Sequence, residues 1–355
     1  MRIAYLTPMK PPDHPVPSGD RTFARLIARA LTEGGHDVLK PSTLRTFCAE
    51  PHALDAILRD APAARDAIAT IGAPPDAILT YHNYHKAPDV IGPTLAAHFD
   101  VPYAIVEPSR APKHQTGPWH AGFAAADAAL RAAHALGVVT PRDRPALTAF
   151  APEKVCPVPP FIDTAPFAGP AGARTGTRLF CAAMLRPGRK ADSVRLLATA
   201  FESVRAARPD VRLTLAGDGP ARAALEPLFP PGTLIGLLPP DALGKAMRAH
   251  DLFVWPALGE PFGFTFLEAA AAGLPAVAGA SPGVAAVVED GVSGVMVPEG
   301  DAPAFAAAVL DLLADPARRA ALSAGAAAFA RTRDLEAGRA SLEALLAHAA
   351  HRHRG

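Results

Sequence analysis

The stretch EPFGFTFLEAAAAGLP, residues 260–275, decides the fold of this chain. Pro261 and Gly263 disfavour a helical interior, whereas the chain from Phe264 onward is apolar and rich in alanine, so a loop that turns into a helix near Phe264 is predicted. The backbone N–H groups at a helix start attract phosphate. Glu260 is then expected in the loop and Glu268 about one turn inside the helix, where a carboxylate can accept hydrogen bonds from ribose hydroxyls. The stretch outlines a site for a sugar nucleotide.

This segment resembles the E-x7-E signature of the retaining GT-B glycosyltransferases of family four, the glycosyl transferases group 1. The resemblance implies that Glu260 contacts hydroxyls of the donor sugar, that Glu268 holds the ribose, and that backbone amides of Gly263, Phe264 and Thr265 hold the diphosphate. It also implies the GT-B fold, in which two Rossmann-like, doubly wound α/β domains face a central cleft. The alternative interpretation is an alanine-rich surface helix with two solvated glutamates, which gives the glycine and proline no purpose.

Length and patterning favour the same α/β architecture. A chain of 355 residues is too long for one ordinary core. Short apolar runs alternate with amphipathic segments, as in parallel sheets covered by helices. Strands are expected at residues 2–6, 37–39, 77–81, 103–107, 136–140, 178–182, 211–216, 233–236, 252–255, 276–278 and 294–297. The proline-rich and glycine-rich stretch 152–172 predicts a linker. We therefore expect an N-terminal acceptor-binding domain at 1–165, a C-terminal nucleotide-sugar-binding domain at 166–336, and a last helix at 337–355 that crosses back, as the resemblance implies.

Composition excludes several classes of protein. The formal net charge of +1 argues against a nucleic-acid partner. The sequence has no run of about 18 apolar residues free of charge and no apolar signal-peptide core at its start, so a cytoplasmic protein is expected. The basic residues 351–354 leave open a weak peripheral contact with the inner face of the membrane, but a frayed, solvated end is the simpler interpretation. Cys48, Cys156 and Cys181 show no spacing typical of a disulfide framework or zinc site.

Other segments of the second half resemble further parts of the donor site. The sequence AAMLRPGRK follows a predicted strand and carries three cations, and fixed cations stabilise the charge that develops on a departing diphosphate. We expect Arg186 and Lys190 to do so, although Arg189 can be aligned as the second cation and a solvated basic loop is the alternative. Gly217 in a strand-end turn and the backbone of Leu238 are expected beside the donor, against the alternative of ordinary turns.

The first half is expected to hold the acceptor. Gly19 and Arg21 lie in a segment that resembles the family's glycine-rich loop near the donor phosphates, although Ser18 replaces one glycine. Arg21 is expected to contact phosphate or acceptor, with a plain surface arginine as the alternative. His82 ends a predicted strand in the place of a family histidine and could orient or deprotonate an acceptor hydroxyl. Glu107 stands in place of a second family histidine and could act as a base, bind a hydroxyl or suit a cationic acceptor.

The resemblance implies transfer with retention of the anomeric configuration by front-face attack. Catalytic roles then fall to His82, Glu260, Arg186 and Lys190. The sequence has no D-x-D motif, and His82 and His85 have no evident third ligand. Neither a metal nor a cofactor is therefore expected. The expected partners are a nucleotide-sugar donor and a glycan, lipid-linked or small-molecule acceptor, and residues 109–122 are expected to form a mobile loop over the acceptor. The alternatives are a sugar-nucleotide epimerase of the same fold and a non-catalytic nucleotide-binding protein.

Overall fold

The computed structural model describes residues 1–355 except 17, 59–61, 171 and 173, and it divides into two compact units. Unit 1 comprises Met1–Pro159 and Leu335–Gly355, and unit 2 comprises Pro160–Asp334. Unit 1 is therefore discontinuous in sequence. Its last helix, α13 (Leu335–Arg354), is made after all of unit 2.

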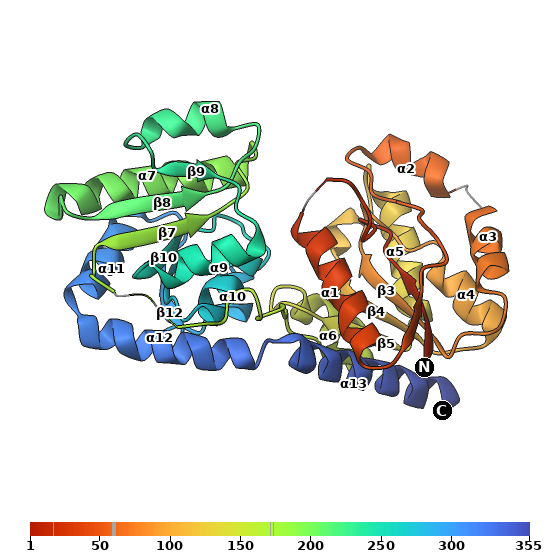
Figure 1. Ribbon diagram of the computed structural model, residues 1–355. Coiled ribbons are helices and arrows are strands. Elements are labelled where there is room, and N and C mark those ends of the chain that lie inside the picture. The colour runs from red at the N-terminus through yellow and green to blue at the C-terminus, as the bar shows by residue number, and fades with distance from the viewer. Residues whose placement is uncertain (17, 59–61, 171, 173) are drawn as a thin grey trace. The chain divides into compact units, whose positions relative to one another are not determined.

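Unit 1 contains a six-stranded parallel sheet in the order β2-β1-β3-β4-β5-β6. Its strands are β1 (Arg2–Leu6), β2 (Asp37–Leu39), β3 (Ala77–Asn83), β4 (Tyr103–Pro108), β5 (Ala135–Val138) and β6 (Val155–Pro157). Its helices are α1 (Gly19–Glu33), α2 (Pro51–Leu58), α3 (Pro62–Ile71), α4 (Gly92–Phe99), α5 (His120–Ala132), α6 (Arg144–Phe150) and α13. The central strands are buried along most of their length, because helices cover a parallel sheet on both faces. Helix α13 packs against α1 and strands β4 to β6 (Figure 1).

Unit 2 contains a second six-stranded parallel sheet, in the order β12-β11-β10-β7-β8-β9. Its strands are β7 (Arg178–Ala182), β8 (Arg212–Ala216), β9 (Leu234–Gly236), β10 (Leu252–Trp255), β11 (Ala276–Gly279) and β12 (Gly294–Val297). Its helices are α7 (Arg189–Ala207), α8 (Arg222–Leu225), α9 (Pro240–Arg248), α10 (Phe264–Ala271), α11 (Ala302–Ala314) and α12 (Pro316–Arg331). The strand order reverses between β7 and β10 in this sheet, and between β1 and β3 in the first. Ligands of open parallel sheets bind at the carboxyl ends of such strands.

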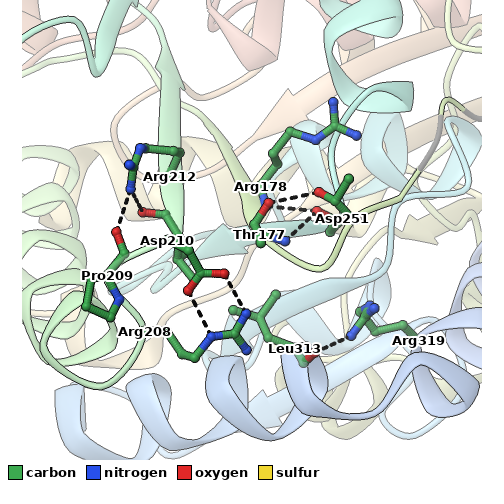
Figure 2. Close-up of polar contacts among 11 residues, drawn as sticks. Thr177, Arg178, Arg208, Pro209, Asp210, Arg212, Asp251, Leu313 and Arg319 are labelled. Atoms are coloured by element: carbon green, nitrogen blue, oxygen red, sulfur yellow. Dashed lines mark hydrogen bonds and ion pairs between the residues drawn. The ribbon is translucent and has the colours of Figure 1, made fainter.

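Polar contacts fix the opposite, amino-terminal edge of the unit 2 sheet (Figure 2). Oδ2 of the fully buried Asp251 accepts hydrogen bonds from the backbone N–H groups of Thr177 and Arg178, at 3.0 and 2.8 Å. Arg319 donates to the carbonyls of Leu312 and Leu313, both at 2.6 Å, and so satisfies acceptors that the end of α11 leaves open. These contacts hold the starts of the strands and leave the carboxyl edge for other chemistry.

The structure corrects three local expectations. The stretch predicted as a linker contains β6, which pairs with β5 and is tolerated beside prolines because it is an edge strand. The segment 109–122 is not a continuous loop, since a 3-10 turn (Pro112–His114) and the start of α5 lie within it. The chain end is not frayed, because α13 continues to Arg354 and His353 donates to the carbonyl of Asp100 at 3.1 Å. None of the helices in the described part of the chain has the length and apolar character that crossing a bilayer requires.

Candidate functional site

Helix α10 begins at Phe264, where the sequence placed its start. Gly263 caps the helix with φ 84°, a left-handed conformation that favours glycine. A Cβ at this position would lie 3.1 Å from the ring of Phe266 and 3.2 Å from Cγ of Glu260, so the loop packs closely on the first turn of the helix. Gly283 in turn lets the carbonyl of Pro261 approach its backbone, where a Cβ would overlap that oxygen. The loop therefore holds Glu260 in a fixed place beside the helix start.

The carboxylate of Glu260 is buried and is held by two donors. Lys190, in the first turn of α7, forms an ion pair with Oε2 of Glu260, and only 8% of the Glu260 side chain is exposed. Trp255 Nε1 donates to the same oxygen at 3.2 Å. The ammonium of Lys190 also lies 5.3 Å from the centre of the Trp255 ring, within range of a cation–π interaction. The structure thus brings Glu260 and Lys190 together where the strand order reverses between β7 and β10.

The loop between β10 and α10 has a shape that its neighbours impose. Ala257 has φ 54°, which is unfavourable for a residue with a Cβ and is found where surrounding contacts enforce it. The next backbone N–H groups are anchored, Leu258 to Oγ of Ser193 at 3.0 Å and Gly259 to Oε1 of Glu299 at 2.5 Å. A Cβ at Gly259 would overlap the guanidinium of Arg189. Arg189 therefore packs along this loop.

Glu268 is the fifth residue of α10 and is partly buried. Within the described part of the chain, its carboxylate accepts no hydrogen bond and forms no ion pair. Burial raises the pKa of Glu268 to about 7. Hydrogen bonds to the ionised form would oppose this effect, so a ligand with hydroxyl donors would find an acceptor here.

The glycines after β8 have a packing role. Gly217 and Gly219 have φ of 151° and 152°. A Cβ on Gly217 would overlap the carbonyl of Ala183, and one on Gly219 would overlap that of Leu185. The two glycines thus let the turn after β8 approach the connection from β7 to Arg186, which is itself partly buried. Packing explains them without a ligand, and contact between Gly217 and a donor stays a prediction. The same holds for Leu238, which is partly exposed after β9 next to Leu237, a residue 70% exposed.

A second cluster lies at the carboxyl edge of the unit 1 sheet. Nε2 of His82 lies 3.6 Å from Oδ1 of Asp20 and 3.6 Å from Oε2 of Glu107. The side chains come from β3, the first turn of α1 and β4, around the reversal of strand order between β1 and β3. His82 lies within β3, which runs to Asn83 rather than ending at residue 81. The structure therefore brings His82 and Glu107 together and adds Asp20.

Charge and burial set the protonation of this cluster. Burial alone would lower the pKa of His82, but Glu107 and Asp20 outweigh it, so that pKa is raised. Burial raises the pKa of Glu107 to about 7, against the opposing effect of His82. Burial would also raise the pKa of Asp20, but contact with His82 outweighs it and that pKa is lowered. The charge of Glu107 therefore changes near neutral pH.

The backbone of this cluster is strained. His82 has φ 68° and Glu107 has φ 56°, both in the left-handed region that costs energy for residues with a Cβ. The Tyr81 and His82 rings contact each other at a tilt of 39°, with centroids 4.2 Å apart. Two strand-end residues are thus held in unfavourable conformations that direct their side chains to one place.

The loop before α1 explains Ser18 and Arg21. Oγ of Ser18 accepts a hydrogen bond from the Arg21 N–H at 3.2 Å, so the serine that replaces a family glycine caps the helix. Gly19 is the first residue of α1. The Arg21 guanidinium donates to the carbonyls of His14 and Pro15, at 2.8 and 3.2 Å, and so holds the loop. A contact of Arg21 with phosphate or acceptor stays a prediction. Pro17 lies outside the described residues.

Sequence reasoning missed Asp20 and Trp255. Asp20 directly follows Gly19 in the first turn of α1, at the edge of the sheet, and this position could have indicated a site residue. Trp255 was read only as the end of an apolar strand, although a strand's last side chain can face a ligand. The ring of His85, the second histidine considered as a metal ligand, stacks on the ring of His114 with centroids 3.9 Å apart. Among the described residues, no three His, Cys, Asp or Glu side chains are placed to hold a metal ion.

Comparison with known proteins identifies the relatives of this chain. Residues 176–315 match the family described as glycosyl transferases group 1. The GDP-mannose-dependent alpha-(1-6)-phosphatidylinositol monomannoside mannosyltransferase of Mycolicibacterium smegmatis is 32% identical over 191 residues, which are 46% of this chain and 48% of that protein. The D-inositol 3-phosphate glycosyltransferase of Thermobispora bispora is 39% identical over 152 residues, 39% of this chain and 35% of that protein. The chain thus spans about half or less of the length of these curated relatives.

Solved structures extend the likeness over both units. Sucrose-phosphate synthase from Thermosynechococcus elongatus has a TM-score of 0.74 at 20% identity, over 97% of this chain and 98% of that chain. Anabaena HepE in complex with UDP has a TM-score of 0.71 at 17% identity, over 98% of this chain and 100% of that chain. At such identity the likeness shows the fold, two Rossmann-like α/β domains. Residues 176–315 of the chain thus match the group 1 glycosyltransferases, and the two units have the GT-B fold.

Proposed function

We propose that the protein moves a sugar from a nucleoside-diphosphate donor to a hydroxyl of an acceptor, with retention of the anomeric configuration and without a metal ion. One observation carries the proposal. Glu260 is held between Lys190 and Trp255 at the carboxyl edge of the unit 2 sheet, directly before the start of α10. This arrangement combines a carboxylate for sugar hydroxyls, an ammonium for phosphate and a helix start for the same phosphate.

The donor would lie along this edge. Backbone N–H groups from Gly263 to Thr265 would hold the diphosphate, because the first turn of a helix has donors without acceptors inside the helix. Glu260 would accept hydrogen bonds from hydroxyls of the donor sugar, and Glu268 from the ribose. The Lys190–Glu260 ion pair must then open, so that Lys190 contacts the phosphate and Glu260 the sugar hydroxyls in place of each other.

The transfer step forms one bond and breaks another at the anomeric carbon. The acceptor oxygen attacks this carbon on the face from which the diphosphate leaves, while the bond from the carbon to the phosphate oxygen breaks and its electron pair stays with the phosphate. The acceptor proton passes to that leaving oxygen. Arg186 and Lys190 would stabilise the charge that develops on the phosphate, which is the contribution a metal ion makes in other enzymes.

Unit 1 would supply the acceptor side. His82 would orient the acceptor hydroxyl and assist its deprotonation, and its Nε2 lies 3.6 Å from both Asp20 and Glu107. The acceptor class named from the sequence is a glycan, a lipid-linked sugar or a small molecule. A cytoplasmic location stays a prediction. Weak contact with the inner membrane face also stays a prediction, and sedimentation with anionic vesicles tests that contact.

Calorimetric titration tests the donor part directly. UDP, GDP and ADP are titrated without metal into the full chain, into Glu268→Ala and into Glu202→Ala, a control at an exposed position of α7. Selective binding of one nucleotide, lost in Glu268→Ala and kept in the control, supports the proposal. Failure of all three nucleotides to bind the wild type contradicts it.

Turnover separates the proposal from its rivals. With the matching nucleotide sugar, a glycosylated acceptor whose anomeric configuration by NMR equals that of the donor supports retaining transfer. An altered nucleotide sugar formed without any acceptor would instead indicate an epimerase. Nucleotide binding without either product would indicate a non-catalytic protein, and inversion of configuration would contradict the front-face mechanism.

A further inference from the structure

The unit 1 cluster contains buried polar atoms that lack hydrogen-bond partners. Nε2 of His82 and Oε2 of Glu107 are both inaccessible to solvent and, within the described residues, form no hydrogen bond. Their separation of 3.6 Å is too long for one. Only 11% of the His82 side chain and 15% of the Glu107 side chain are exposed. Leaving such groups unsatisfied is costly, so the site is arranged for a group that is not part of the protein.

The charge of the cluster favours a cation. Carboxylates of Asp20, Glu107 and Asp143 all act on His82, and His82 contacts the first two of them. Lys10 acts on Asp20, where its effect is the weakest of those that set the Asp20 charge. The guanidinium of Arg21 is turned toward the carbonyls of His14 and Pro15. The negative charges therefore exceed the positive charges near Nε2 of His82, and an anionic group placed there would be repelled.

We propose that the acceptor bound by unit 1 is an amine-bearing sugar or cyclitol, whose ammonium lies against Glu107 and Asp20 while one of its hydroxyls contacts His82. This inference rests on the proposed glycosyl transfer and names the substrate class of its acceptor. The ammonium donates to Oε2 of Glu107, which has no donor among the residues that the structure describes. It also places a positive charge beside the two carboxylates that His82 faces.

The same exchange prepares His82 for its role. An ammonium beside the two carboxylates lowers the pKa of His82, so Nε2 more readily accepts a hydrogen bond from the acceptor hydroxyl. A neutral polyol would satisfy the hydrogen bonds of the cluster but leave its charge unbalanced. A phosphorylated acceptor would place an anion beside two carboxylates. The amine is therefore recognised through charge, and the adjacent hydroxyl through the imidazole.

Binding by saturation-transfer NMR tests this on the full chain, with two matched probe sets. The sets are glucosamine, glucose and glucose 6-phosphate, and an inosamine, myo-inositol and myo-inositol phosphate. We expect the amine of at least one set to bind about tenfold more tightly than its hydroxyl counterpart, and the phosphate most weakly. Glu107→Gln should lower amine affinity about tenfold and leave the hydroxyl counterpart nearly unchanged.

Controls separate this inference from the proposed function. Glu50→Gln removes a carboxylate at an exposed position of unit 1 and should change neither preference. Asp20→Asn should give the same selective loss as Glu107→Gln and serves if the latter does not fold. The inference is overturned if no amine binds, if hydroxyl or phosphate probes bind as tightly as amines, or if Glu107→Gln weakens all probes equally. The nucleotide titration reports on the proposed function independently of each of these results.

Discussion

Lys190 and Glu260, 70 positions apart in the chain, form an ion pair at the carboxyl edge of the unit 2 sheet. The pair joins the start of α7 to the loop before α10, and Trp255 donates to the same carboxylate oxygen. The side chain of Lys190 is 31% exposed and that of Glu260 is 8% exposed. The charge of Glu260 therefore depends on its partner for stabilisation, whereas that of Lys190 can be stabilised by water. Removal of Lys190 should therefore destabilise the protein more than removal of Glu260.

Lys190→Met is expected to destabilise unit 2 by about 1 to 3 kcal/mol, because it leaves Glu260 buried without its counter-charge. Glu260→Gln should cost less, since Lys190 can turn to solvent. Urea unfolding of both variants and of the double variant gives the coupling between the two residues. Lys245→Met, at an exposed position of α9, is the matched control. Strictly additive effects would show that the pair is not coupled in solution.

Glu268→Gln should stabilise the protein at pH 8 by about 1 to 2 kcal/mol, allowing for partial exposure of this side chain. Its pKa is raised from 4.5 to about 7, so the folded state holds its proton more tightly than the unfolded chain. The wild type therefore loses stability as the pH rises between these values, and the variant does not. Unfolding measured from pH 4 to 8 tests this, and an equal difference at both ends of the range would contradict it.

Nucleotide binding should show the opposite dependence. Ribose hydroxyls stabilise ionised Glu268, so affinity is expected to rise as the pH increases through about 7. Glu268→Gln should bind more weakly and lose this dependence. Calorimetry at pH 6, 7 and 8 measures it. A wild-type affinity that stays constant over this range would show that Glu268 does not receive the ribose.

Glu107→Gln should lower the pKa of His82. Burial lowers that pKa and Glu107 is the foremost group that opposes burial, so its loss leaves only Asp20 and Asp143 against the burial effect. Burial raises the pKa of Glu107 itself to about 7, so its charge acts on His82 only as the pH rises toward and above that value. NMR titration of the His82 ring protons measures the shift. The Glu50→Gln spectrum should match the wild type.

Gly263→Ala should cost about 1 to 2 kcal/mol for its left-handed backbone and more for crowding against Phe266 and Glu260. Gly232→Ala is a matched control, because Gly232 has φ 81° but a Cβ there would meet nothing within 4 Å. Thermal unfolding gives the difference between them. Only Gly263→Ala should also weaken nucleotide binding. Equal effects on binding would remove the helix start from the donor site.

The sequence predicted the fold class and the start of α10 because both depend on local signals. Proline and glycine interrupt the chain before Phe264, and alternation of apolar runs with amphipathic segments indicates parallel sheets. Strand β6 was missed because its three residues lie among prolines and are ordered by pairing with β5. Propensity says little about a strand that tertiary pairing creates.

The candidate site was predicted unevenly for a related reason. Glu260 and Lys190 follow from motifs, but their ion pair depends on which strands are neighbours in the sheet. Asp20 joins His82 only because β1 and β3 are neighbours in the sheet, although β1 first pairs at Ile3 and β3 at Ala77, far along the chain. The left-handed backbone of His82 and Glu107 has no sequence signal, since neither residue is a glycine.

The discontinuity of unit 1 has a consequence for how the protein is made. Leu345 of α13 is fully buried and lies close to Gly137 of β5, where an added Cβ would be 3.0 Å from it, so the sheet of unit 1 stays partly uncovered until α13 has been made. Unit 2, continuous from Pro160 to Asp334, is complete before that point. Completion of the first sheet thus depends on a helix that follows the whole of unit 2 in the chain.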